Sequence, residues 1–351
     1  MKKRLKYIDI ARGLAMIFIV FGHTIVYSEH CDLIYQFLYS FHVALFFVIS
    51  GYTFNIPTNY HEFVKNKFIR IMIPYFIWSF LFLIPYILLG QTLHLGSEMK
   101  ASFNVITQCK NILYGNGNNF ALKQNSSLWF LPAVFIMEIC YSLFIKVFNR
   151  GEKFSLEISF CFIQIIIGFI STLILIDIFL PWGINSTIQF GVFFYMGYLL
   201  KKRLLLDKIR FKYLALFVFS ILGILCCFLN YKRVSAIDYN YGNYILAILS
   251  GFTLSVSVLL ICVKIKENIL LEYLGKNTMS ILIFHKIVLM ICQSKLGIIT
   301  SLLKNSTWYI ELLIVFGISS CAILFSLAIN IFAKRIFPEL IGEKRKKEVE
   351  G

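Results

Sequence analysis

Ten long apolar runs limit this sequence to very few folds. A bilayer core about 30 Å thick is crossed by roughly 20 residues of helix. A chain of 351 residues that is 59% hydrophobic and 15% charged cannot cover the water-facing surface of a soluble globular protein. Since no run shows the repeated alternation of barrel strands, the sequence predicts an all-α, polytopic transmembrane helix bundle of about ten spans. The runs are Ile8 to Tyr27, Tyr35 to Phe54, Ile69 to Leu89, Leu128 to Phe148, Ile158 to Leu180, Ile188 to Leu200, Tyr213 to Leu229, Tyr244 to Val263, Met279 to Cys292 and Trp308 to Phe332.

The charges between the runs predict the orientation of the chain. There are 34 Lys and Arg residues against 18 Asp and Glu, a net charge of +16. With the N-terminus in the cytoplasm, about 25 basic residues fall on the cytoplasmic side and about seven outside, as the positive-inside rule requires. We therefore expect both termini in the cytoplasm, including a basic tail over residues 334–351, and no nucleic-acid partner.

The sequence is expected to form one membrane-integral domain over residues 1–351. The first run follows a basic start, but it lacks a small-residue cleavage site and contains Arg12 and His23, so it is interpreted as a retained helix. The largest outer loop, residues 90–127, is rich in Asn, Gly and Ser and is expected to cap an outward-facing cleft. Most of the nine cysteines lie inside apolar runs, and no Cys or Cys/His spacing suggests a metal site.

Three ionisable residues within the first run, Asp9, Arg12 and His23, are candidates for function because such groups are costly in a bilayer. Eleven helical steps from Arg12 to His23 come to about 20° past three full turns, so the two share one face, with a rise of roughly 16 Å. Arginine suits phosphate and histidine suits taking a proton from a hydroxyl. The alternative is that Arg12 only reaches the headgroups and Asp9 pairs with it at i, i+3.

A basic cluster opens the third run, in KNKFIRIMIPY. It contains Lys65, Lys67 and Arg70, with Lys67 and Arg70 one turn apart beside Pro74. The functional interpretation is a clamp on the phosphates of a cytoplasmic donor such as a coenzyme A thioester. Ordinary positive-inside anchoring explains the same charges.

Further polar residues lie within later runs. Glu138 is buried in the fourth run, where a carboxylate needs a partner, so we expect it to orient a histidine or to pair with an arginine. His285 in the ninth run is expected to face a cavity, whereas Lys286 beside it can extend to the surface. His42 and Ser50 in the second run can also be explained by structural roles. His42 would be an interfacial histidine, and Ser50 would hydrogen-bond a carbonyl of its own helix.

The first-run segment DIARGLAMIFIVFGH resembles the signature of the membrane-integral acyltransferase-3 family. That signature is Asp-x-x-Arg-Gly followed by Gly-His, and it is matched by Asp9, Arg12, Gly13, Gly22 and His23, with the family's ten-residue gap between Arg and His. The resemblance covers nearly the whole chain. It implies that Arg12 and His23 are an essential pair, with His23 as the catalytic base.

Other segments extend the resemblance and show where it departs. FHVALFFVISGY, LWFL and LGKNTMSILIFH all match family motifs, the last ending in His285. The third-run motif of many members is Arg-x-x-Arg, whereas this chain has Lys67-x-x-Arg70. A lysine keeps the charge but loses the bidentate fork of arginine.

The resemblance implies an O-acetyltransferase of the bacterial plasma membrane. We expect acetyl-CoA as donor, bound near Arg12, Lys67 and Arg70, and a cell-surface or lipid-linked saccharide as acceptor, with Glu138 and His285 assisting His23. A glycan transporter or flippase is the rival interpretation, because buried charges in a ten-span bundle also describe carriers. A membrane scaffold would give no account of the Arg12 and His23 face.

Overall fold

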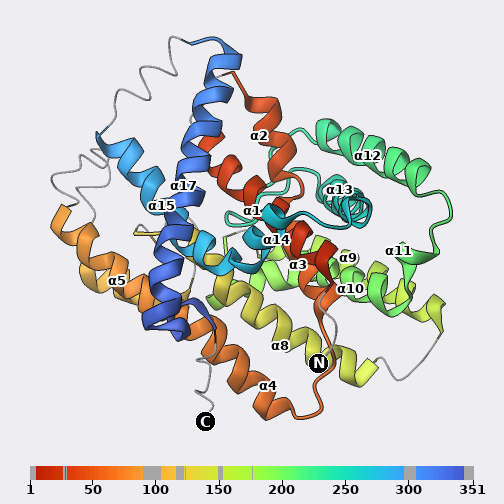
Figure 1. The fold of residues 1–351 in the computed structure, drawn as a ribbon. Helices are drawn as coiled ribbons and strands as arrows, with labels where there is room; N and C mark the ends of the chain where they lie inside the picture. The colour runs from red at the N-terminus through yellow and green to blue at the C-terminus, as the bar shows by residue number, and fades with distance from the viewer. Residues whose placement is uncertain are drawn as a thin grey trace, which may run out of the picture.

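The computed structural model describes residues 5–26, 28, 30–89, 104–115, 122, 124–148, 153–175, 177–295 and 306–343. These residues form helices joined by short connections, and their only β-type pairing is an isolated bridge between Ser235 and Asn240. The prediction of an all-α helical bundle is therefore confirmed (Figure 1). Residues 90–103, 116–121 and 123 of the expected outer loop, and 344–351 of the basic tail, lie outside the described residues.

The helices follow one another along the chain with few long breaks. In order they are α1 (Lys6–Ile25), α2 (Asp32–Tyr39), α3 (His42–Thr53), α4 (Tyr60–Lys67), η1 (Phe68–Met72), α5 (Ile73–Leu89), α7 (Val105–Tyr114), η3 (Ser126–Trp129), α8 (Phe130–Phe148), α9 (Phe154–Ile174), η4 (Pro181–Gly183), α10 (Ile184–Lys202), α11 (Leu205–Lys208), α12 (Lys212–Leu229), α13 (Tyr244–Ile265), α14 (Ile269–Lys276), α15 (Thr278–Lys295), α17 (Trp308–Ile336) and η5 (Pro338–Ile341).

By length and composition, the described residues contain eight helices that can cross a membrane, or up to nine if a bent pair is one span. The bent pair is α14 and α15, which meet at 84°. The difference from about ten spans lies in α10, a 19-residue helix whose first turns carry Asn185, Ser186, Thr187 and Gln189. These polar residues are buried against protein rather than lipid, which explains how so polar a helix fits in the bundle.

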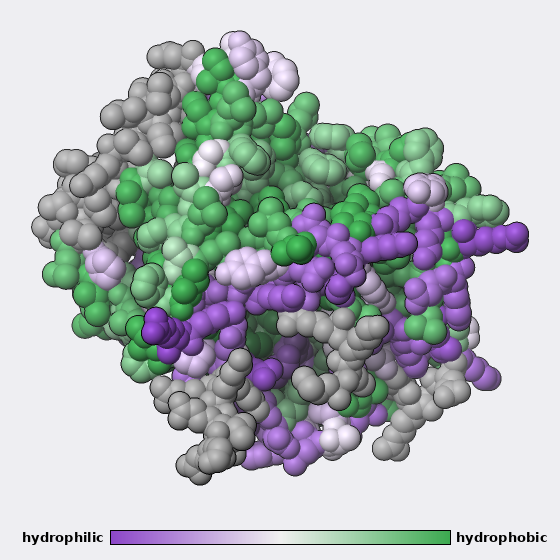
Figure 2. Space-filling view, in the orientation of Figure 1, coloured by the Kyte–Doolittle hydropathy of each residue, from purple (hydrophilic) through white to green (hydrophobic). Residues whose placement is uncertain are grey.

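The spans divide into central and peripheral helices. The apolar windows of α13 and α1 are 72% and 67% buried, whereas those of α9, α17 and α12 are 28%, 22% and 17% buried. The peripheral helices present rows of exposed Ile, Leu and Phe side chains, and Figure 2 shows wide apolar areas beside a band of hydrophilic residues. Lipid is the environment that such surfaces require.

Glycines allow the central helices to approach until their backbones touch. A Cβ at Gly13 of α1 would overlap the carbonyl of Leu271 in α14, and one at Gly275 would overlap the carbonyl of Asp9. Between α3 and α10, a Cβ at Gly51 would overlap the carbonyl of Phe194, and Gly197 meets α3 in the same way. Small residues at helix contacts are the usual means of close packing in membranes.

The corner between α14 and α15 is held by buried amides. Asn330 Nδ2 and Lys334 Nζ, both of α17, donate to Asn277 Oδ1 at 2.8 Å each, and Ser280 Oγ donates to Asn330 at 2.6 Å. Because the Asp9 end of α1 packs on α14 as well, the first turns of α1 and the last turns of α17 lie at the same end of the bundle. This placement fits two termini on one side, while the cytoplasmic assignment stays a prediction. We call this the basic end and the opposite one, where His23 lies, the histidine end.

Candidate active site

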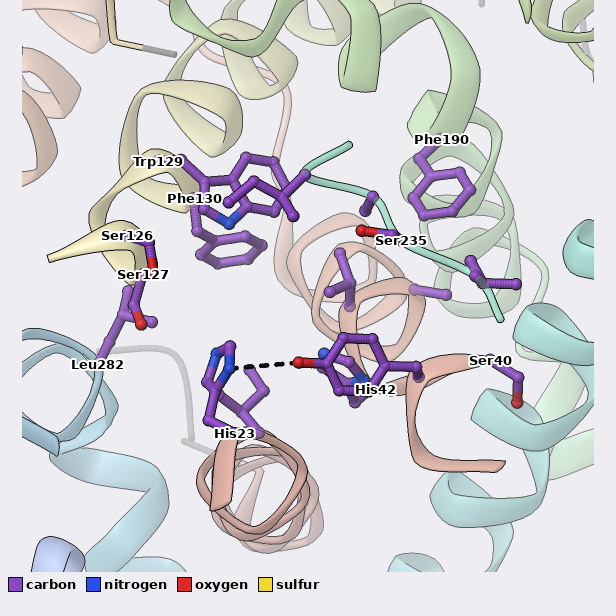
Figure 3. A pocket seen from close by; sticks show the side chains of 17 residues that line it. His23, Ser40, His42, Ser126, Ser127, Trp129, Phe130, Phe190, Ser235 and Leu282 are labelled. Carbon is purple, nitrogen blue, oxygen red and sulfur yellow. Dashed lines mark hydrogen bonds between the residues drawn. The ribbon is translucent and has the colours of Figure 1, made fainter. Parts of the chain in front are cut away.

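A cavity lies at the histidine end (Figure 3). Its empty volume is about 660 Å³, which includes the solvent at its opening. Two histidines, several serines and a set of aromatic rings line it. The lining residues come from α1, the α2–α3 segment, η3 and α8, α10, α15 and the loop between α12 and α13. They are Ile19, His23, Tyr39, Ser40, His42, Val43, Ala44, Ser126, Ser127, Trp129, Phe130, Phe190, Val234, Ser235, Ala236, Ile237 and Leu282.

His23 projects from α1 into this cavity. Its Nδ1 lies 3.3 Å from the hydroxyl of Tyr39, and its ring stacks on that of His285 with centroids 5.4 Å apart and planes 22° apart. Its Nε2 forms no hydrogen bond with any residue that the structure describes. His23 is thus held by one hydroxyl and one ring, and its second nitrogen is left for a substrate.

The other two histidines have their ring nitrogens assigned by contacts within their own chain segments. His42 Nδ1 lies 2.7 Å from the carbonyl of Leu38, and His285 Nδ1 lies 2.7 Å from the carbonyl of Ile281. A carbonyl only accepts, so each Nδ1 carries the proton and each Nε2 is an acceptor. His285 Nε2 then accepts a hydrogen bond from Ser127 Oγ at 3.3 Å.

Ser127 reaches His285 because an asparagine fixes the start of its helical turn. Asn125 Oδ1 accepts from the Ser127 N–H at 3.1 Å, which caps η3. The same side chain donates to the carbonyl of Ile283 in α15 at 2.8 Å. The last residues of the predicted outer loop are therefore attached to α15 and line the cavity.

In the loop between α12 and α13, residues 230–243, the segment 234–237 lines the cavity and forms its roof. Asn230 donates to the carbonyl of Tyr241 at 2.9 Å and accepts from the Asn243 N–H at 2.9 Å. Gln36 of α2 donates to the Asn230 carbonyl at 3.0 Å. Burial raises the pKa of Tyr239 to about 12, so its hydroxyl is neutral. Buried polar contacts thus fix the backbone of this roof.

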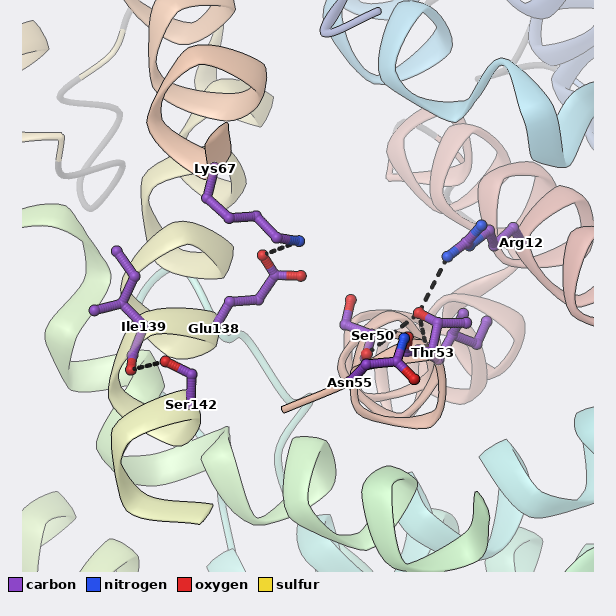
Figure 4. A network of polar contacts seen from close by, with 9 residues as sticks. Arg12, Ser50, Thr53, Asn55, Lys67, Glu138, Ile139 and Ser142 are labelled. Atoms are coloured by element: carbon purple, nitrogen blue, oxygen red, sulfur yellow. Dashed lines mark hydrogen bonds and ion pairs between the residues drawn. The ribbon is translucent and has the colours of Figure 1, made fainter. Parts of the chain in front are cut away.

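Arg12 lies at the other end of α1. Its guanidinium is 3.6 Å from the Asp9 carboxylate. It also donates to Thr53 Oγ1 at 3.2 Å, at the end of α3 (Figure 4). The predicted i, i+3 pairing of Asp9 and Arg12 is confirmed. Since Arg12 contacts one end of the α2–α3 segment and His23 contacts Tyr39 near the other, both side chains face this same neighbour.

Lys67 and Glu138 form an ion pair at the basic end. Lys67 Nζ lies 2.5 Å from Glu138 Oε2, with the Glu138 side chain buried and that of Lys67 half-buried (Figure 4). Glu138 was expected to orient a histidine or to pair with an arginine, and this was wrong, because η1 packs against α8 and the lysine directly before η1 reaches the carboxylate. Arg70 lies in η1, a single π-helical turn, is exposed, and has no ion pair among the described residues.

The structure therefore joins some of the predicted residues and separates others. His23 and His42 line one cavity, and Arg12 lies on the same α1 face as His23. His285 was expected to face a cavity, but it does not line this one; it is fully buried and stacks on the His23 ring. Lys67 turns inward to Glu138, whereas Arg70 stays outside that pair, so the two do not form one clamp here. Within the described residues, no group of His, Cys, Asp and Glu side chains is arranged to hold a metal ion.

Sequence reasoning missed three contributors to the cavity. Tyr39 stands at a break between two short helices that the apolar pattern reads as one run, and Ser127 is one of several serines in a polar loop. The roof, residues 234–237, has no motif at all. Only Tyr39 carried a signal in the sequence, because it lies three residues before His42 in the same apolar run.

Comparison with protein families gives one match over most of the chain. The family model described as an acyltransferase domain, of the acyltransferase-3 type, matches residues 5–331. No curated protein and no solved structure matches the chain.

Proposed function

Because this chain belongs to the acyltransferase-3 family, we propose that it is a multi-pass membrane enzyme that moves an acetyl group from cytoplasmic acetyl-CoA to a hydroxyl of a saccharide. The saccharide is a cell-surface or lipid-linked glycan, and the membrane is the bacterial plasma membrane. The observation that carries this proposal is the cavity lined by His23 and His42, with His285 stacked on His23, at the far end of a helix whose near end holds Arg12.

The two ends of α1 fit the two halves of this reaction. Arg12 and Lys67 at the basic end suit the phosphates of coenzyme A, which are anionic and cannot enter an apolar interior unpaired. The rise between Arg12 and His23 is roughly 16 Å, so a donor with its phosphates at Arg12 must extend its thioester along α1. The cavity at His23 offers serine hydroxyls and the Trp129 ring, groups that hydrogen-bond and stack on a sugar.

His23 acts as the general base through Nε2. In the tautomer whose Nδ1–H donates to the Tyr39 oxygen, Nε2 takes the proton of the sugar hydroxyl as the sugar oxygen attacks the thioester carbonyl carbon. The new C–O bond forms, the C–S bond breaks, and the thiolate receives the proton from the imidazolium. His285 stacks on the base and, through Ser127, fixes the wall against which it packs.

A second route uses His23 as a nucleophile that carries the acetyl group before the sugar receives it. In that case an acetyl-imidazole forms when the donor is present without an acceptor. Brief incubation with isotopically labelled acetyl-CoA, followed by mass spectrometry of the peptide containing residue 23, separates the two routes. Label on His23 identifies the covalent route, and its absence during active turnover identifies direct transfer.

Proton NMR of the host's surface glycan tests the function. Cells with the intact protein, without it, and with His23→Ala are compared, and His61→Ala serves as the control because His61 is exposed on α4. We expect the O-acetyl signal to disappear in the second and third samples and to persist in the control. Acetylation that persists without the protein, with less glycan exported, would instead support a transporter.

A further inference from the structure

An exposed cation stands at the edge of the roof over the His23 cavity. Residues 234–237 of the 230–243 loop line the cavity, and Arg233 directly precedes them (Figure 3 shows Ser235 of this loop above the histidines). The hydrogen bonds from Asn230 and Gln36 fix the backbone at the start of the loop. Arg233 is therefore presented at a set position beside the cavity.

Aromatic rings connect Arg233 to the histidine. The guanidinium carbon lies 4.0 Å from the centroid of the Tyr35 ring and 5.9 Å from that of Tyr39. The two tyrosine rings are 4.4 Å apart in an edge-to-face arrangement, and the Tyr39 hydroxyl contacts His23. A guanidinium that packs on the face of an aromatic ring still has N–H groups along its edge, and these can donate hydrogen bonds to an anion.

The charge of Arg233 is not cancelled by the described residues around it. Asp32 of α2 and Asp238 of the same loop form no ion pair with Arg233, which has none within the described part of the chain. Asp238 already accepts a hydrogen bond from Ser235 at 2.7 Å. Lys232 lies next to Arg233 in sequence and over a different ring, that of Tyr231.

We propose that Arg233 is an acceptor-binding residue, which holds an anionic group, a carboxylate or a phosphate, of the saccharide whose hydroxyl reaches His23. This inference rests on the proposed function and adds the class of acceptor to it. Arginine matches both anions because its planar edge forms paired hydrogen bonds. A neutral saccharide would leave this cation without a role at the cavity.

The test uses the full protein in lipid nanodiscs, labelled acetyl-CoA, and the host's own saccharides separated by anion exchange into neutral and anionic pools. We expect label to enter the anionic pool. Arg233→Gln raises the acceptor KM by about 10- to 100-fold, as the loss of a charge-assisted pair predicts, and leaves the donor KM unchanged. Arg233→Lys keeps the charge but loses the paired N–H donors, so its acceptor KM should lie between those of the intact protein and Arg233→Gln.

Lys232→Gln is the matched control, since it removes the neighbouring positive charge without touching Tyr35. Reduction of carboxylates or removal of phosphates in the acceptor pool shows which anion is bound. Label confined to the neutral pool, or equal effects of the two Gln variants, overturns the inference while leaving the proposed function intact. No label in either pool with the intact protein overturns the proposed function, and the inference with it.

Discussion

The two ends of α1 differ in how their polar groups are partnered. At the basic end, Arg12 and Lys67 each face a carboxylate, from Asp9 and Glu138. At the histidine end, the described contacts of His23, His42 and His285 are hydroxyls, carbonyls and rings. A cation in an apolar interior needs a counter-charge, so in the proposed function the basic end exchanges its carboxylates for the phosphates of the donor. In the same proposal, the histidine end keeps neutral bases ready to take a proton.

The strongest test of this division is His23→Ala. We expect kcat to fall by about 10²- to 10⁴-fold, the usual contribution of a general base, while the donor KM stays within about twofold of the intact protein because the basic end is unchanged. Steady-state kinetics in nanodiscs measure both. A large rise in donor KM with little change in kcat would place donor binding at the histidine end and break the division.

Arg12→Lys is expected to give the opposite pattern. The charge remains but the fork that grips a phosphate is lost, so the donor KM rises by about 10-fold or more and kcat changes less. The same assay with donor concentration varied at fixed acceptor provides the numbers. An unchanged donor KM would mean that Arg12 serves only as an anchor at the membrane surface.

Gly51→Ala tests whether the two ends depend on one helix. The new Cβ would overlap the Phe194 carbonyl, and such overpacking costs about 1 to 3 kcal/mol of stability. Because α3 carries His42 at one end and Thr53 at the other, we expect a lower melting temperature together with losses in both kcat and donor binding. Gly317→Ala, where a Cβ meets nothing within 4 Å, is the control and should change none of them.

Glu138→Gln should have the smallest effect on the donor KM, and it should lower that KM rather than raise it. Without its carboxylate partner, Lys67 is free to bind a phosphate, so the donor KM falls by about fivefold, as the loss of a partly buried pair worth about 1 kcal/mol predicts. Lys67→Gln in the same assay raises it. A fall in kcat at unchanged donor KM would instead make Glu138 a catalytic residue.

The sequence predicts contacts within one helix better than contacts between helices. The Asp9–Arg12 pair and the shared face of Arg12 and His23 follow from helical spacing alone. The stacking of His285 on His23 and the pairing of Lys67 with Glu138 do not, because they depend on which distant helices pack together. The burial of the polar helix α10 and the bend between α14 and α15 could not be predicted either. Both depend on neighbouring helices, which the hydropathy of a single segment does not describe.

The glycine contacts between α1 and α14 bear on the order in which the protein is made. Chains are synthesised from the N-terminus and enter the membrane as they emerge, so α1 exists long before the helix on which Gly13 and Asp9 pack. Until α14 arrives, the backbone of α1 at Asp9 and Gly13 lacks the helix against which it packs. Assembly of this protein therefore finishes late, and a ribosome that stops before α14 leaves an inserted bundle whose first helix is not yet docked.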